Sequence, residues 1–283
     1  MRRDRRAELP VSALPVLFVS HGSPMMALAP GEAGAALQRW GQSLTARDDV
    51  RAVVVMSPHW MAPVAAVGSH PMPPTWHDFG GFPPALYRLQ YPAPGDPALA
   101  RAVAERLQAA GIPTGEDPQR PRDHGAWAPL RFLLPQARWP VVQVALPADA
   151  GPAEVYAIGA ALADLRRDGV LMVGSGSLTH NLMEFFGGRP AIDESADPYV
   201  LAFSAWVWQA LQAGDLPALL DYRNRAPQAA RAHPSDEHLL PLFFALGAAG
   251  WPTAGAPDGQ PAAHAITREV QYRYLAMDSY ALV

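Results

Sequence analysis

Short, continuously apolar runs alternate with longer amphipathic stretches along most of this chain. Apolar runs of about four to eight residues that are rich in β-branched side chains predict buried strands, and apolar residues three or four positions apart predict helices. The predicted strands are residues 15–20, 51–57, 141–146 and 170–174. The predicted helices are residues 31–43, 96–110, 124–134, 152–167, 198–213 and 235–246. This pattern predicts an α/β fold with a mostly parallel or mixed central sheet flanked by helices.

Two other stretches complete the predicted organisation. Residues 61–95 are rich in proline and glycine and are long for a plain connection, and such loops are commonly functional. Within residues 265–282, alternating side chains predict an antiparallel strand or hairpin. Because no internal repeat or low-complexity linker occurs, we expect one domain over residues 15–283, preceded by a flexible N-terminus over residues 1–14.

The composition limits the chemistry more than the fold. The chain has 283 residues and no cysteine, which excludes disulfides, thiolate metal sites and cysteine nucleophiles. Its net charge is -4 and its one basic cluster, residues 2–6, is short and terminal, so we expect no nucleic-acid partner. We read no signal peptide and no membrane span, and therefore expect a cytoplasmic protein. Nothing in the sequence specifies an oligomeric state.

The placement of the histidines indicates where the chemistry lies. His21 and His59 follow two of the predicted strands, and His180 lies shortly after a third. His238 lies near the start of an apolar helix. Ligands of open α/β sheets bind beyond the carboxyl ends of the strands, and imidazole is the obvious metal donor in a chain without thiols. The sequence therefore predicts a metal site at this edge of the sheet.

Each of these residues also has a simpler interpretation. His21 is compatible with a hydrogen-bonded histidine in a turn, and Asp123 before His124 is typical of a helix N-cap. Glu237 and His238 are neighbours, so their spacing leaves open which of the two points inward. The choice matters because two histidines and one carboxylate form the facial triad of non-haem Fe(II) oxygenases.

Other segments lack comparable support. His233 lies five residues before His238, which is off one helical face, so we do not expect the two to bind one metal. His70 and His264 are expected at the surface or in loops. The glycines of residues 174–176 fit neither a phosphate-binding loop nor a nucleophile elbow.

Seven short segments carry a resemblance to a known family. They are Ser20-His-Gly-Ser-Pro24, Ser57-Pro-His-Trp60, His77-Asp-Phe-Gly-Gly-Phe-Pro83, Tyr91-Pro-Ala-Pro-Gly95, Asp123-His-Gly-Ala-Trp127, His180-Asn-Leu182 and Glu237-His-Leu-Leu-Pro241. In these segments the chain resembles the class III extradiol ring-cleavage dioxygenases, in the 4,5-DOPA dioxygenase subgroup. The resemblance implies that residues 15–283 form a catalytic domain that opens the ring of a catechol, a small DOPA-like aromatic substrate, with O2.

The resemblance also assigns roles to the histidines. His21, His59 and His238 match metal-ligand positions. His180 matches the catalytic base, which is also counted as a fourth metal ligand in this subgroup, and His124 matches a histidine that faces the substrate. One divalent metal ion is implied; Fe(II) is expected for ring cleavage, and Zn(II) is an alternative occupant because imidazole suits both. Four aromatic residues are expected to shape a slot for the substrate ring: Trp60, Phe79, Phe82 and Trp127.

Two other functions remain open at this point. A zinc-dependent hydrolase would use a metal-bound hydroxide as its nucleophile and His180 or a carboxylate as its base. A non-enzymatic binding protein on the same fold would be expected to have an altered metal pocket, whereas all four histidines are retained here.

Overall fold

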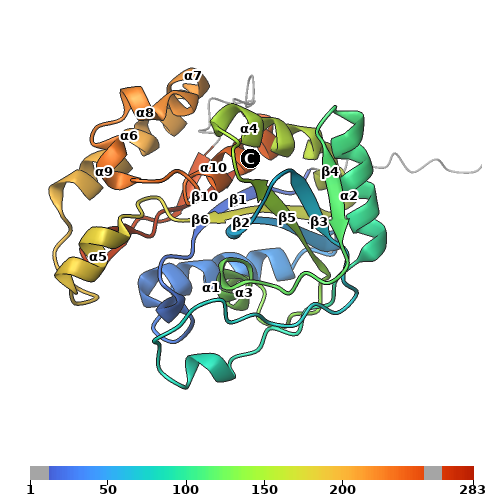
Figure 1. Cartoon of the computed structure of the whole chain (residues 1–283), viewed down its shortest axis with the longest axis horizontal. Helices are drawn as coiled ribbons and strands as arrows, with labels where there is room; N and C mark the ends of the chain where they lie inside the picture. The colour runs from blue at the N-terminus through green and yellow to red at the C-terminus, as the bar shows by residue number, and fades with distance from the viewer. Residues whose placement is uncertain (1–12, 252–262) are drawn as a thin grey trace, which may run out of the picture.

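An eight-stranded mixed sheet runs through the middle of the molecule (Figure 1). The computed structural model describes residues 13–251 and 263–283. The strands of the sheet are β1 (Val16–Ser20), β2 (Ala52–Ala62), β3 (Ala65–Gly68), β4 (Thr114–Asp117), β5 (Val141–Pro147), β6 (Val170–Gly176), β7 (Ala263–Thr267) and β10 (Ser279–Leu282). Their order is β4-β3-β5-β2-β6-β1-β10-β7. The four central strands β5, β2, β6 and β1 are parallel, and antiparallel pairings with β3 and β10 flank them.

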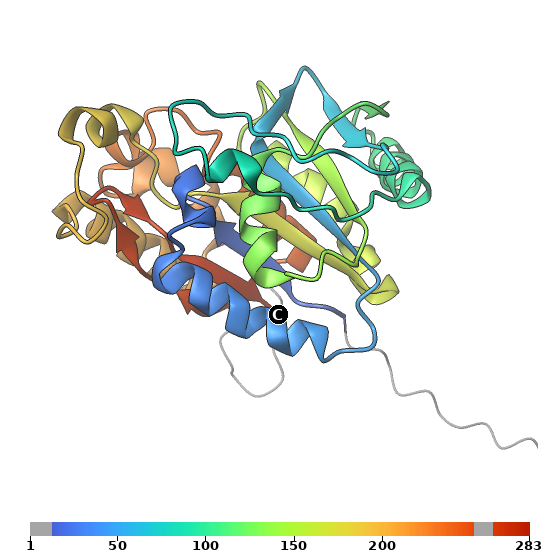
Figure 2. The ribbon, with the colours of Figure 1, turned by 90° about the horizontal axis from the view of Figure 1, so that it is seen from below.

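Helices cover both faces of this sheet (Figures 1 and 2). One face is covered by α1 (Gly31–Thr45) and α3 (His124–Leu133), and the other by α4 (Pro152–Ala161) and α10 (Leu240–Ala249). The remaining helices are α2 (Pro97–Ala109) beside β3 and β4, α5 (Leu182–Gly188), α6 (Pro198–Ala213), α7 (Leu216–Leu220), α8 (Tyr222–Arg225) and α9 (Ala229–Ala232). Short 3-10 turns η1 (Pro24–Ala27), η2 (Leu86–Arg88) and η3 (Ala163–Asp168), and a hairpin of β8 (Val270–Gln271) and β9 (Leu275–Ala276), complete the described elements.

The central strands are apolar on both sides because two cores lie against them. Val16 and Phe18 of β1 belong to the core that includes α4 and α10, whereas Leu17 and Val19 belong to the core that includes α1 and α3. Successive strand residues point to opposite faces, so a strand covered on both sides needs an apolar residue at every position. The predicted single α/β domain with a mixed sheet is confirmed, and the four predicted strands are β1, β2, β5 and β6.

The second predicted strand is longer than its apolar run. β2 continues to Ala62, and its pairing with β5 is irregular between Ser57 and Met61. His59 therefore lies within this strand and not beyond its end. The predicted loop 61–95 contains β3, and β4 was not predicted because its four residues are only half-buried or exposed and form no apolar run.

Several predicted helix boundaries are wrong. The predicted helix 152–167 is α4 followed by η3, and the predicted helix 235–246 begins only at Leu240. Ser235 therefore does not cap it, and His238 lies in the preceding turn. This turn is held against β6 because the backbone N–H of Ser177 donates to the His238 carbonyl over 2.9 Å.

The C-terminal region pairs as an antiparallel structure, as predicted. β10 pairs with β1 and β7, and β8 pairs with β9. Tyr272 has a φ of 51° and lies in the turn between β8 and β9, so the alternation that it forms with Tyr274 is not that of one strand.

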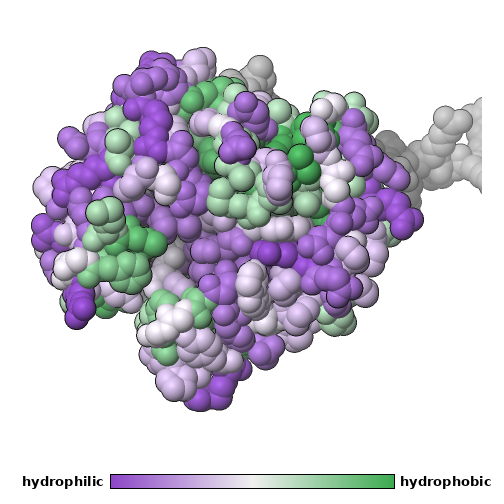
Figure 3. All heavy atoms as spheres, in the orientation of Figure 1, coloured by the Kyte–Doolittle hydropathy of each residue, from purple (hydrophilic) through white to green (hydrophobic). Residues whose placement is uncertain are grey.

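Three further observations concern the N-terminus, the helices and the surface. Residues 1–12 of the predicted flexible N-terminus lie outside the described residues. Within the described part of the chain, no helix combines the length and the hydrophobicity needed to cross a membrane. Helix α5, which was not predicted, has no buried residue, and Figure 3 shows hydrophobic side chains gathered over it on the left of the molecule.

Candidate metal centre

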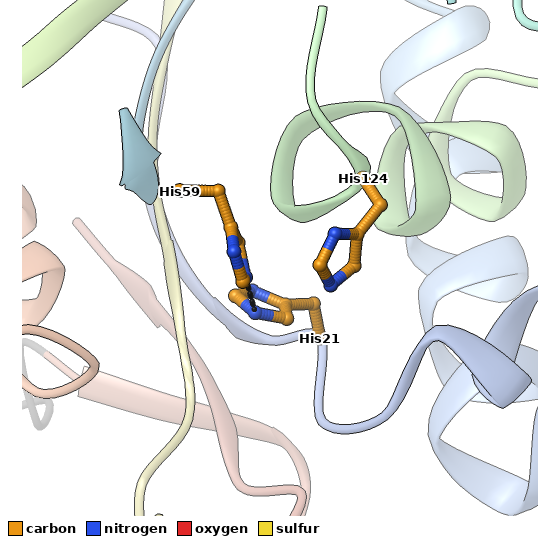
Figure 4. Close-up of side chains that lie close together, drawn as sticks. All are labelled: His21, His59 and His124. Carbon is orange, nitrogen blue, oxygen red and sulfur yellow. Dashed lines mark hydrogen bonds between the residues drawn. The ribbon is translucent and has the colours of Figure 1, made fainter. Parts of the chain in front are cut away.

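Five histidines from five separate segments meet at the carboxyl end of the parallel strands. His21 follows β1, His59 lies near the end of β2, His124 begins α3, and His180 and His238 precede α5 and α10. The ring centroid of His59 lies 5.0 Å from that of His21 and 3.9 Å from that of His124. The ring of His238 lies 5.2 Å from that of His59 and stacks on that of His180 at 3.5 Å. Figure 4 shows three of these rings pointing toward one another.

The imidazoles of His21 and His59 face each other through their Nε2 atoms, which are 3.1 Å apart (Figure 4). The Nδ1 of His21 lies 3.0 Å from Oγ of Ser175, whose hydroxyl proton is donated to the Gly125 carbonyl. His21 Nδ1–H is therefore the donor to Ser175, which leaves a lone pair on Nε2. The carboxylate of Asp78, 3.5 Å from His59 Nδ1, favours the same tautomer for His59. Two lone pairs at this separation repel each other unless a cation lies beside them.

The carboxylate of Asp78, from the long 61–95 loop, lies beside the rings of His59 and His124. Asp78 Oδ1 accepts hydrogen bonds from the backbone N–H and the Nδ1–H of His124, at 3.0 and 2.9 Å, while Oδ2 lies near His59. Burial by itself would raise the pKa of Asp78, but the bond from His124 holds that pKa below its usual range. This role was not predictable from the sequence, because 46 residues separate Asp78 from His124.

A second carboxylate stands beside the other two rings. Oε1 of Glu237 accepts a hydrogen bond of 2.9 Å from His238 Nδ1 and lies 3.9 Å from His180 Nδ1. Metal-binding histidines commonly donate their second ring N–H to a carboxylate, which fixes the tautomer and the orientation of the ring. Glu237 is placed to act in this way on His238.

Two glycines allow the backbone to approach the rings this closely. A Cβ on Gly125 would lie 2.2 Å from Ser57 Oγ and 2.8 Å from a carbon of the His59 ring. A Cβ on Gly176 would lie 2.2 Å from the carbonyl oxygen of His238. A side chain at either position would push α3 or the turn before α10 away from the sheet.

Burial keeps the rings of His21, His59, His180 and His238 neutral. Desolvation, together with repulsion from His124, lowers the pKa of His59 to about 3, and desolvation lowers the pKa of His180 to about 4. Burial also lowers the pKa of His21 and of His238 well below 6.5. Metal binding needs a neutral imidazole, and these rings need not lose a proton at pH 7 before they bind a metal.

The donor set fits a divalent metal ion. Bonds of about 2.0–2.1 Å place neighbouring nitrogen donors about 3.0–3.4 Å apart, which matches the 3.1 Å between His21 and His59. Two compact groups of possible donors occur among the described residues, namely His21, His59 and His124, and His180, Glu237 and His238. The rings of His124 and His238 both lie 5.5 Å from that of His21. The geometry therefore offers two candidates for a third donor.

A cavity of about 290 Å³ opens onto the histidines, and His59, His124, His180 and His238 line it together with Asp78. Phe79 and Phe82 also line it, as predicted, but Trp60 and Trp127 are buried in the interior and do not. The rest of the apolar lining was not predicted from the sequence and comes from Leu182, Phe185, Phe186 and Leu275. A larger cavity of about 400 Å³ beside α4 contains no histidine, so size alone does not identify the site.

Three histidines outside the predicted ligand set, His70, His233 and His264, lie away from this cluster. His233 is fully buried in the core, where its Nε2 donates to the Leu178 carbonyl over 2.8 Å. His70 accepts a local backbone hydrogen bond in a loop, and His264 is exposed on β7. Asp123 is the N-cap of α3, as its simpler interpretation predicted.

A protein-family model described as the catalytic LigB subunit of aromatic ring-opening dioxygenase matches residues 15–273. The chain belongs to the LigB family. It is therefore an oxidoreductase of the ring-opening dioxygenase class, and the predicted membership of the extradiol dioxygenases is confirmed. The family implies a single catalytic metal ion, for which the histidine cluster is the candidate site.

Known proteins are similar to this LigB-family chain over most of its length. A 4,5-DOPA dioxygenase extradiol from Beta vulgaris is 37% identical over 235 residues, which cover 82% of this chain and 86% of that protein. A protein of the same name from Escherichia coli K12 is 37% identical over 244 residues, which cover 83% and 85% of the two. The crystal structure of an uncharacterized Escherichia coli K12 protein has the same fold, with a TM-score of 0.73 and 27% identity over 95% of this chain and 100% of that one.

Proposed function

We propose that this LigB-family enzyme is a metal-dependent extradiol dioxygenase that opens the ring of a DOPA-like catechol next to its two hydroxyl-bearing carbons. Both atoms of O2 enter the product, a semialdehyde, so the reaction needs no external reductant. The observation that carries the proposal is the approach of the His21 and His59 Nε2 atoms to 3.1 Å beside a cavity lined by aromatic side chains. The motifs and the names of the relatives support a catechol of the DOPA type.

The proposed ligands of the metal ion are His21, His59 and His238, with Fe(II) as the working ion and Zn(II) as an alternative occupant. A bound ferrous ion would supply redox chemistry toward O2, which zinc lacks. Asp78 and Glu237 leave the Nε2 lone pairs of His124 and His238 equally free. We therefore choose His238 as the third ligand because it matches the ligand position of the family.

His180 is proposed as the base that takes a proton from a catechol hydroxyl. Its Nδ1 lies 3.9 Å from Glu237, beyond hydrogen-bonding distance, so this ring is less tied than that of His238. Desolvation lowers its pKa to about 4, so the ring is neutral and keeps a lone pair for a proton, and the negative charge of Glu237 acts in the opposite direction and favours the protonated ring. The carboxylate of Glu237 would stabilise the imidazolium until the proton returns to the substrate. His124, anchored through Nδ1 to Asp78, is left with Nε2 to accept a hydrogen bond from the second hydroxyl.

Oxygen uptake by metal-loaded protein tests the proposal. Protein loaded anaerobically with Fe(II) should consume one O2 per catechol and form a yellow ring-opened product, and zinc-loaded protein is the matched control that should consume none. Absence of uptake across a panel of catechols would overturn the proposed activity. Ester or amide hydrolysis by the zinc-loaded protein would instead support the hydrolase alternative.

A further inference from the structure

The proposed ligand His59 lies in a bulge of β2. The pairing of β2 with β5 is irregular between Ser57 and Met61, so residues 58–60 leave the regular ladder. Backbone groups that lose their ladder partners in a bulge need other partners when they are shielded from water. The His59 N–H donates to Ser57 Oγ over 3.3 Å, and the His59 carbonyl accepts from Arg120 Nη2 over 2.9 Å. Side chains therefore replace the sheet at the residue that bears the ligand.

The guanidinium of Arg120 lies over two indole rings. Its carbon atom Cζ is 4.9 Å from the ring centroid of Trp60 and 4.8 Å from that of Trp76. A guanidinium is attracted to the face of an indole ring, and two such contacts restrict the rotation of the side chain. The side chain of Arg120 is only 14% exposed, so little water competes for these contacts. The same contact accounts for Trp60, which was predicted to shape the substrate slot but does not line the cavity.

The buried carboxylate of Asp123 ties the bulge to β5 and to the start of α3. Its Oδ1 accepts hydrogen bonds from Ser57 Oγ over 2.9 Å and from the backbone N–H of Ala126 over 3.2 Å. Its Oδ2 accepts from Gln143 Nε2 and, over 3.4 Å, from Arg120 Nη2. Asp123 is fully buried, where a carboxyl group needs hydrogen-bond partners. Arg120 contacts both this carboxylate and the carbonyl in the bulge, so it joins the bulge to the rigid part of the domain.

Resting on the proposed function, in which His59 is a ligand, we infer that Arg120 is a positioning residue of the metal centre. Arg120 does not line the cavity, so it acts through the His59 carbonyl that it holds. Fixing this carbonyl fixes the main chain from which the imidazole extends, and with it the direction of the Nε2 lone pair. Hydrogen-bond partners behind a ligand have the same effect when they hold its ring.

Replacement of the guanidinium tests the inference. Arg120→Met removes the charge and the donors and keeps an apolar chain that packs on the indole rings. We expect the affinity for Zn(II), measured by chelator competition, to fall about 10- to 100-fold. Arg166→Met is the matched control, because Arg166 also donates to backbone carbonyls, those of Leu14 and Ala249, at the edge of the sheet opposite the histidines. Wild-type affinity in Arg120→Met, or an equal loss in both variants, would overturn the inference.

The same substitution in a His59→Ala background shows through which residue Arg120 acts. If it acts through His59, Arg120→Met should change the remaining Zn(II) affinity by less than about twofold in this background. A loss as large as that in the wild-type background would overturn the inference. His59→Ala alone tests the proposed function separately. Wild-type affinity in His59→Ala would remove His59 from the ligands, whereas a loss there and none in Arg120→Met would overturn only the positioning role.

The visible absorption spectrum of Co(II)-loaded protein gives a second measurement. This spectrum depends on the arrangement of the ligands, so it should change in Arg120→Met and stay unchanged in Arg166→Met. Arg120→Gln provides the same comparison if Arg120→Met does not fold, because its side chain is planar and polar but two bonds shorter than arginine. We expect the same loss of affinity and a changed spectrum. Wild-type affinity and an unchanged spectrum in Arg120→Gln would overturn the inference.

Discussion

His21 and His233 are both buried histidines, yet they differ in what their ring nitrogens meet. They are 1% and 0% exposed, and burial lowers the pKa of His21 well below 6.5 and that of His233 to about 3. His21 is anchored by Ser175 through Nδ1, and its Nε2 is aimed at His59. His233 uses its Nε2 on the Leu178 carbonyl, and its Nδ1 finds no hydrogen-bond partner among the described residues.

The surroundings of the two rings explain the difference. The ring of His233 lies among aromatic side chains, 5.5 Å from Phe203 and 6.4 Å from Tyr222, and His233 lines neither of the two cavities described above. The ring of His21 lies in a cluster that borders a cavity. Burial and a lowered pKa are therefore common to a structural and a functional histidine. The convergence of several free nitrogens on one point is what distinguishes them.

Replacing either histidine by alanine should give the largest effects, and the two effects should differ in kind. His21→Ala should weaken metal binding by about a hundredfold or more and abolish ring opening. His233→Ala should retain the metal and lower the free energy of unfolding by about 1–3 kcal/mol. Competition with a chelator and chemical denaturation measure the two effects. Retention of the metal at wild-type affinity by His21→Ala would remove the basis of the proposed site.

The third ligand can be identified by a paired substitution within the cluster. If His238 is the ligand, His238→Ala should lose metal affinity about a hundredfold, whereas His124→Ala should retain the metal and lose about 10²- to 10⁴-fold in turnover. Metal content after dialysis and oxygen uptake give the two readouts. The opposite pattern would assign the metal to the compact group of His21, His59 and His124.

The sequence predicted the parts of this molecule that depend on local pattern. The central strands are continuous apolar runs, so their position and the sheet edge that gathers His21 and His180 followed from periodicity. β4 was not predictable in this way, because its residues are only half-buried or exposed and it is held by pairing with β3.

The supporting residues of the site were less predictable. Asp78 contacts His124 across 46 residues, and no spacing rule connects them. Phe185 and Phe186 lie on a seven-residue helix without a buried face, so they carry no helical pattern. Glu237 was recognised as a neighbour of His238, but only the structure shows its carboxylate behind the ring.

Substitution of Asp78 should lower metal affinity less than loss of a ligand does, because Asp78 orients histidine rings and is not one of the proposed ligands. Asp78→Asn keeps the size of the side chain and an acceptor for the His124 N–H, but it loses the charge that faces His59. We expect metal affinity to fall about 10- to 100-fold, measured by chelator competition. Asp96→Asn is the matched control, because Asp96 caps α2 and asparagine caps as well. An equal loss in both variants would mean that Asp78 has no specific role.

The smallest effect concerns the pH dependence that His233 adds to stability. Its pKa is about 3 in the folded chain and near 6.5 when unfolded. Between these values the unfolded chain binds more protons, so stability falls as the pH drops from 6.5 toward 3, by up to about 1.4 kcal/mol per pH unit. His233→Gln keeps a donor for the Leu178 carbonyl and does not titrate. Denaturation of both metal-free proteins at pH 6.5 and pH 5 should show that the wild type loses up to about 2 kcal/mol more than the variant. The histidine cluster titrates equally in both proteins and cancels, so equal losses would show that His233 is not held neutral by its burial.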